Sequence, residues 1–346
     1  VGIVAVFLIL TFVRRTPAVP VRTDWFGLMV LMLTLFSLQI ALDQGDKLDW
    51  FSSHLIVHLF LVAGVGAVIF CVRGAYLGER HIINIGLLRD LNFTLCCVFV
   101  TVISSGFLAL MILTPILFVD LIGWQPSSAG MVIGCYGVGG ITGSFISGRL
   151  QAFLTFRQIY IMGCLFMASG WGWFSGLNED IGLWQGVPPG VLIVFGMFLV
   201  FPVLAARAFS KLPPHMRDEG AGLFNLTKTL GFSFGTTFVG TLYYNGQLEN
   251  WSRYVGNIDP ANPVLQDYLD ALGSNVSDDV KMAYVSTVLQ EQAQLMTVFQ
   301  IGQYMTFFVL SLLVLAIFFG DKKSDSAPGL FHRLFGVAAT TGPASR

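Results

Sequence analysis

The sequence predicts an all-α polytopic membrane protein, and three observations lead to this fold class. The chain of 346 residues has a mean hydropathy of +0.73 and contains 55% hydrophobic but only 11% charged residues, whereas charged residues make up about a quarter of a soluble domain. Its apolar residues gather in separate stretches, most of which reach the roughly 17–25 residues that a membrane-spanning helix requires. Its Lys and Arg residues gather in alternate connections, as expected when a chain crosses a bilayer repeatedly.

Nine apolar stretches follow one another along the chain. They cover residues 1–13, 25–42, 55–72, 93–121, 127–150, 158–176, 186–209, 223–245 and 297–319. The first is too short to span a bilayer and is interpreted as the end of a truncated helix, although a signal peptide is an alternative. The next two form a pair, 25–72. The remaining six predict a compact bundle over 93–319, after a connection rich in charged residues.

The basic residues predict which side of the membrane each connection faces. If residue 14 is cytoplasmic, the short connections carry eleven basic residues inside and only Lys47 outside. The long segment 246–296 is then external, and it is acidic. Ser277 is a suitable N-cap for a helix that leads into the last stretch. The tail 320–346 is rich in Ser, Pro and Gly and is predicted to be disordered and cytoplasmic.

Carboxylates are placed at the edges of the apolar stretches and not within them. All twenty acidic residues lie in connections or near helix ends, so none matches the mid-membrane carboxylate that a proton carrier normally uses. Asp43 and Asp120 come closest, each at an outer helix end. Gln39 lies four residues before Asp43 on the same helical face, which favours a polar contact between neighbouring helices. The alternative is that these residues only shape the helix ends.

Two polar stripes are candidates for the lining of a cavity. Asn225 and Lys228 share one face of the stretch 223–245, and a cation inside a membrane span is a candidate functional residue. The Lys228 side chain can also snorkel to the inner surface, so an anchoring role stays open. Ser104, Ser105 and Met111 form a weakly polar stripe, and Phe198 belongs to an aromatic one. Packing in the core or against lipid is the alternative for both stripes.

The stretch 130–148 is unusually rich in glycine. Small residues let helix backbones approach closely in membranes, so this segment predicts a helix-packing face. The face comprises Gly130, Gly134, Gly137 and Gly148, with Gly140 and Ser144 beside it. Pro115 and Pro202 lie inside apolar stretches and predict kinks or breaks.

Several functions are disfavoured by what the sequence lacks. The five cysteines lie within apolar stretches without a disulfide or metal-binding pattern, and His54 and His58 have ligand-like spacing but no third ligand. A net charge of −1 without a basic cluster argues against nucleic acid as a partner. No metal, cofactor or enzyme activity is therefore predicted.

Three segments carry a resemblance to a known family. Residues 24–53, 83–97 and 221–237 read DWFGLMVLMLTLFSLQIALDQGDKLDWFSS, INIGLLRDLNFTLCC and AGLFNLTKTLGFSFGTT. They closely resemble the EmrB/QacA-type, 14-helix drug:proton antiporters of the major facilitator superfamily. The resemblance implies that residues 1–13 end a preceding helix, that 25–72 hold two linker helices, and that 93–319 form the second six-helix bundle. The loop 148–158 departs from the superfamily pattern, because it keeps Gly148 and Arg149 but lacks the acidic and second basic positions.

The resemblance also implies a function. It is the export of amphipathic drugs or other toxic organic compounds by alternating access in a bacterial inner membrane, with the proton gradient as energy source and no cofactor. The partners implied are these small substrates, the lipid bilayer and a periplasmic EmrA-like adaptor that docks at the acidic outer segment. The residues nominated for the substrate cavity are Ser104, Ser105, Met111, Phe198, Asn225 and Lys228. A non-transporting membrane scaffold or receptor remains the alternative.

Overall fold

The computed structural model describes residues 10–11, 24–77, 85–178, 181–210, 212–213, 216–256, 263–271 and 277–315. Within these ranges the regular structure is entirely helical, with no strand, which confirms the predicted all-α class. Most of segment 1–13 and the predicted disordered tail 320–346 lie outside the described residues.

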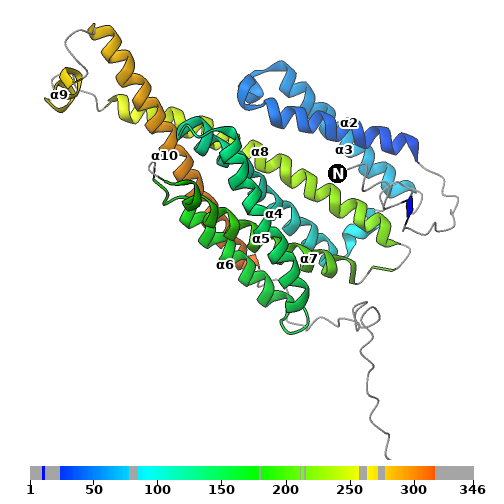
Figure 1. Ribbon diagram of the computed structural model, residues 1–346. Helices are drawn as coiled ribbons and strands as arrows, with labels where there is room; N and C mark the ends of the chain where they lie inside the picture. Colours follow the sequence, from blue (N-terminus) through cyan, green and yellow to red (C-terminus); the bar gives the residue numbers. More distant parts are fainter. Residues whose placement is uncertain are drawn as a thin grey trace, which may run out of the picture.

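Two groups of helices are visible along the chain (Figure 1). The first is the pair α2 (Trp25–Gln44) and α3 (His54–Leu77). The second contains α4 (Leu91–Pro115), α5 (Pro126–Leu150), α6 (Phe156–Phe174), α7 (Val187–Ser210), α8 (Arg217–Gly256), α9 (Pro263–Ala271) and α10 (Asp278–Leu315). Short turns of 3-10 helix lie at η1 (Asp46–Leu48), η2 (Trp50–Ser52), η4 (Ile85–Arg89) and η6 (Leu183–Gln185).

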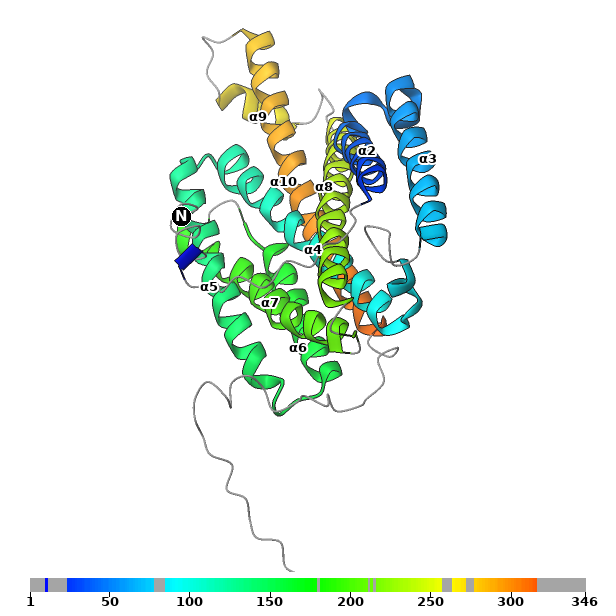
Figure 2. The same cartoon turned by 90° about the vertical axis from the view of Figure 1, so that its right-hand side faces the viewer.

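The second group packs as a bundle in which α4 and α7 are central. Helix α4 contacts both α7 and α8, α7 also contacts α5 and α6, and α10 closes the bundle against α6 and α8. The pair α2 and α3 lies to one side and contacts the bundle through α8 (Figure 2). The buried core follows this arrangement, with Phe99, Leu110 and Trp171 among its fully buried side chains.

Glycines allow the closest contacts in the bundle. A Cβ atom built at Gly143 would lie 2.6 Å from the carbonyl oxygen of Phe195, and one at Gly139 would collide with the carbonyl of Val191. Ser147, one turn further on, donates a hydrogen bond of 2.7 Å to the carbonyl of Leu199. The stripe Gly139, Gly143 and Ser147 therefore brings the backbones of α5 and α7 together.

The predicted packing face of α5 is not the face that contacts α7. A Cβ atom at Gly130, Gly134, Gly137 or Gly148 would meet nothing within 4 Å, so these glycines do not face a neighbouring helix among the described residues. Gly140 lies at the edge of the true contact, 3.4 Å from the Phe198 ring by the same measure. The segment carries two glycine registers of helical spacing, and periodicity alone does not tell which of them meets a neighbour.

Pro115 marks a change of helix type. The α-helical pattern of α4 ends there and continues as a π-helical turn, η5 (Ile116–Leu121). Since proline cannot donate the hydrogen bond of a regular helix interior, a local irregularity is expected beside it. Helix α7 runs through Pro202 without a break.

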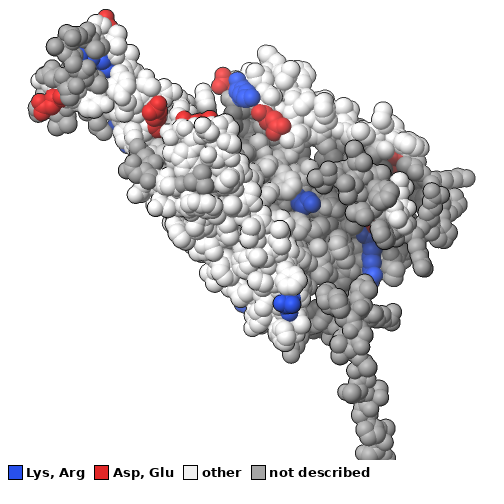
Figure 3. Space-filling model, in the orientation of Figure 1, with Lys and Arg blue, Asp and Glu red and all other residues white. Residues whose placement is uncertain are grey.

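The surface of the described helices suits a lipid environment. Six helical segments are long and apolar enough to cross a membrane: Trp25–Gln44, His54–Leu77, Leu91–Leu121, Pro126–Leu150, Val187–Ser210 and Asp279–Val314. Large apolar side chains on them are exposed, such as Phe36 on α2, Leu61 on α3 and Phe307 on α10. Figure 3 shows a broad surface without charged atoms, with acidic atoms towards the α9 end. Such an extensive apolar surface is typical of contact with lipid.

An ion pair ties α2 to α3. The guanidinium of Arg73 donates hydrogen bonds to both carboxylate oxygens of Asp24, the shortest at 2.9 Å, and stacks over the Phe26 ring at 4.8 Å. Asp24 also accepts from the backbone N–H of Gly27 and so caps α2. One carboxylate thus fixes both the start of α2 and its partner helix.

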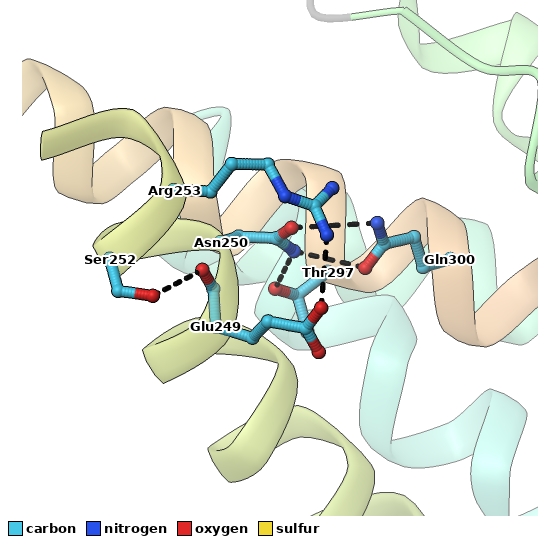
Figure 4. Close-up of polar contacts among 6 residues, drawn as sticks. All are labelled: Glu249, Asn250, Ser252, Arg253, Thr297 and Gln300. Atoms are coloured by element: carbon cyan, nitrogen blue, oxygen red, sulfur yellow. Dashed lines mark hydrogen bonds and ion pairs between the residues drawn. The ribbon is translucent and has the colours of Figure 1, made fainter. Parts of the chain in front are cut away.

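Helices α8 and α10 continue beyond the apolar stretches as a projecting pair that carries α9 (Figure 1). Helix α10 begins directly after Ser277, as the N-cap prediction requires. The two helices are joined by Asn250, whose side chain is only 2% exposed. Its amide donates to Thr297 Oγ1 and to Gln300 Oε1, each at 2.9 Å (Figure 4). This buried network holds the projecting pair together.

Candidate binding pocket

A pocket that contains predicted site residues lies between α4, α5 and α7. It has a volume of 690 Å³, which is within the range of about 300–1,000 Å³ typical of small-molecule sites. Its wall is almost wholly apolar, with hydroxyl groups contributed by Tyr136 and Ser144. The lining residues are Phe107, Met111, Ile133, Tyr136, Gly137, Gly140, Ile141, Ser144, Phe145, Val194 and Phe198.

The pocket brings together predicted residues from different stripes. Met111 from α4 and Phe198 from α7 face the same space, which Gly137, Gly140 and Ser144 of α5 complete. The small residues that were expected to pack against a helix therefore leave room for the pocket. This arrangement follows from the rotation of α5, which directs Gly139 and Gly143 to α7 instead.

Phe107 is the central aromatic residue that the sequence reasoning missed. Its ring centroid lies 6.4 Å from that of Phe198 and 6.2 Å from that of Phe232 on α8, so it joins the pocket to α8. Phe107 precedes Met111 by four residues and so shares its helical face. This helical spacing is the signal in the sequence that places Phe107 beside Met111.

Lys228 lies one helical turn from this aromatic layer. Its Nζ atom is 5.6 Å from the centroid of the Phe201 ring, which follows Phe198 by one turn of α7. On α8, Lys228 precedes Phe232 by one turn. The ammonium group therefore lies beside the pocket, displaced towards the end of the bundle where Arg207 lies, and does not itself line the wall. Asn225 is exposed, and its amide donates to the carbonyl of Ala221 at 3.0 Å.

Comparison with known families places this geometry in context. The family model described as Major Facilitator Superfamily matches residues 1–236, which is more than half of the chain. The chain belongs to the Major Facilitator Superfamily. Membership indicates a transporter and not an enzyme, and with the six membrane-capable helices it makes this a multi-pass membrane protein.

Individual relatives within the superfamily carry export and resistance names. The chain is 28% identical to "Multidrug export protein EmrB" of Escherichia coli (strain K12) over 283 residues, which cover 79% of this chain and 54% of that protein. It is 26% identical to the protein of the same name from Haemophilus influenzae over 281 residues, 81% of this chain and 55% of the relative. It is 24% identical to "Fatty acid resistance protein FarB" of Neisseria gonorrhoeae over 306 residues, which cover 88% of this chain and 59% of that protein.

The predicted resemblance to EmrB-like members of the superfamily is thereby confirmed. The chain spans about half the length of these curated relatives.

The other residues nominated for the cavity of this superfamily member lie elsewhere. Ser104 is fully buried, and its hydroxyl has no hydrogen-bond partner among the described residues. Ser105 lines a second pocket of 450 Å³ between α4, α8 and α10, and its hydroxyl donates to the carbonyl of Val102. The stripe Ser104, Ser105 and Met111 is therefore divided among three environments, and the prediction that it lines one cavity is wrong for the described chain.

Gln39 makes the contact between α2 and α8. Its amide nitrogen donates to both carboxylate oxygens of Asp43, at 3.0 and 3.1 Å, and its amide oxygen accepts from the hydroxyl of Ser233. Asp43 and Asp120 are both exposed. Within the described ranges, no group of three or more His, Cys, Asp and Glu side chains is arranged to hold a metal ion.

Proposed function

We propose that this chain forms the second half of a secondary active transporter that exports amphipathic drugs or other toxic organic compounds. The observation that carries the proposal is the apolar pocket between α4, α5 and α7, of a size suited to a drug-like molecule, in a chain of the Major Facilitator Superfamily. The names of the relatives, which refer to multidrug export and to fatty acid resistance, support a substrate of this amphipathic class.

The proposed mechanism is alternating access. Residues 93–319 act as one bundle that rocks against a preceding bundle about a central site, with 25–72 as linker helices and 1–13 as the end of the preceding helix. The segment 246–296 is the external part, and 320–346 a cytoplasmic tail. Rocking of one rigid body suits the close contact of α5 with α7 at Gly139 and Gly143, because such a contact resists deformation within the bundle.

We further propose that the proton gradient supplies the energy, without a bound cofactor, in the inner membrane of a bacterium. The acidic residues of this chain lie near helix ends, so the proton-binding carboxylate belongs to the preceding bundle in this scheme. A periplasmic adaptor of the EmrA type is the proposed partner of the external segment, where acidic atoms gather (Figure 3).

Dye efflux from cells that lack their own exporters tests the proposed pocket. We expect Met111→Ala and Phe198→Ala in the complete gene product to lower efflux of amphipathic dyes by about tenfold, because each removes apolar contact worth about 1.4 kcal/mol. Leu165→Ala is the matched control, since Leu165 is 50% exposed on α6 and does not line the pocket.

Efflux at the parental rate by both pocket variants, at equal amounts of protein, would refute the assigned site. Coupling is measured with purified protein in liposomes, where transport should stop when an ionophore collapses the proton gradient. Dye binding without gradient-dependent transport would indicate a receptor or scaffold instead.

A further inference from the structure

We propose that the pocket selects anionic amphiphiles, with the ammonium group of Lys228 binding the negative head group and the aromatic pocket binding the apolar body. The inference rests on the proposed function, because it assigns the charge class of the substrate to the same site.

The charge of Lys228 is not balanced by a carboxylate of the described residues. Lys228 is half-buried on α8, five residues inside the apolar stretch that begins at Leu223. In the part of the chain that the structure describes, its recorded partner is the Phe201 ring and no carboxylate pairs with it. A cation in such a position normally has a partner of opposite charge. The face of an aromatic ring balances it only in part and leaves the three N–H donors usable.

Lys228 and the pocket lie in adjacent layers of the bundle. The rings of Phe198, Phe107 and Phe232 form one layer across α7, α4 and α8, with neighbouring centroids 6.4 and 6.2 Å apart. Phe201 and Lys228 form the next layer, one turn closer to Arg207. An amphiphile whose apolar body lies against Phe107 and Phe198 in the pocket therefore has to extend only about one helical turn, roughly 5 Å, for its head group to meet the ammonium ion.

Among the residues that line the pocket, no charge competes with that of Lys228. None of its lining residues is ionisable at neutral pH, since Tyr136 is the only titratable member and its hydroxyl donates to the carbonyl of Gly186. Charge discrimination at this site therefore depends on Lys228. A cationic amphiphile would place its head group against a like charge, whereas an anionic one gains a charge-assisted hydrogen bond.

The test compares three probes that share one aromatic body: pyrenebutanoate, pyrenebutanol and pyrenebutyl-trimethylammonium. Fluorescence anisotropy reports their binding to the complete gene product in nanodiscs of zwitterionic lipid. We expect the parent to bind the anion about tenfold more tightly than the cation, which corresponds to about 1.4 kcal/mol. Lys228→Gln should abolish this preference by weakening the binding of the anion alone. Lys228→Arg should keep most of the preference, and Lys228→Glu should reverse it.

Controls separate this proposal from the proposed pocket itself. Lys47→Gln removes the same charge from an exposed position between α2 and α3 and should leave the anion preference unchanged. Phe198→Ala should weaken the binding of all three probes to the same extent. If Phe198→Ala does so while Lys228→Gln keeps the parental preference, the pocket stands and the anion selectivity is overturned. If Phe198→Ala changes no probe, the pocket assignment fails irrespective of Lys228.

Discussion

At the residue scale, the contact between α5 and α7 depends on the absence of side chains at two positions. We expect Gly143→Ala to destabilise the protein by about 1–3 kcal/mol, because its new methyl group would lie 2.6 Å from the carbonyl oxygen of Phe195 and force the helices apart. Gly134→Ala is the matched control on the same helix, since its Cβ meets nothing within 4 Å. There, alanine should be neutral or stabilising by about 0.4–1 kcal/mol. Thermal unfolding in detergent measures both, and equal melting temperatures for the two variants would contradict this account.

The same helix shows where sequence reasoning stops at this scale. Gly130, Gly134 and Gly137 have helical spacing, and so do Gly139 and Gly143. A helical projection identifies faces but not the neighbours that occupy them, because neighbours are fixed by contacts distant in sequence. A projection assigns Met111 and Phe198 to faces of two separate helices, and only the packing of those helices brings both to one pocket and Ser105 to another.

At the element scale, the projecting pair of α8 and α10 depends on one amide. Asn250→Ala should loosen the pair, because the partly buried Gln300 loses its donor while the hydroxyl of Thr297 keeps its bond to Ala293. A lost buried hydrogen bond of this kind costs about 1–3 kcal/mol. Amide hydrogen exchange in residues 246–256 and 285–300 should then become about tenfold faster or more.

The control lies one residue away. Glu249 and Arg253 form an ion pair of 2.9 Å, but their side chains are 72% and 56% exposed. Exposed pairs contribute little to stability, so Glu249→Gln should leave the exchange rates unchanged. If both variants exchange alike, Asn250 does not hold the two helices together.

Helix starts were easier to predict than helix lengths. The start of α10 after Ser277 follows from a local capping preference, which a few residues suffice to define. The extension of α8 to Gly256 does not follow from a local preference, because residues after 245 are polar and their helical state depends on packing against α10. An apolar stretch ends where the chain leaves the lipid. The helix itself continues as long as it packs against a neighbouring helix.

At the scale of the whole molecule, the distribution of basic residues fixes the expected topology. In a cysteine-free background, we expect Ser286→Cys on α10 to react with an impermeant thiol reagent in intact cells. We expect Ala152→Cys, at the end of α5 beside Arg149, to react only after the membrane is permeabilised. Both positions are exposed in the structure. The opposite pattern of labelling would reverse the orientation and the positive-inside argument with it.

Helix α8 also has a mechanical consequence. Its 40 residues run without interruption from Arg217 to Gly256, which gives a rod of about 60 Å at about 1.5 Å per residue. A bilayer core of about 30 Å holds only half of this rod. The eleven residues 246–256 beyond the apolar stretch form an outer lever arm of about 16 Å, and a tilt of about 15° in the membrane would displace its tip by about 4 Å. Because the hydrogen bonds of Asn250 join this arm to α10, we expect a rotation of the bundle in the membrane to move α9 together with the arm.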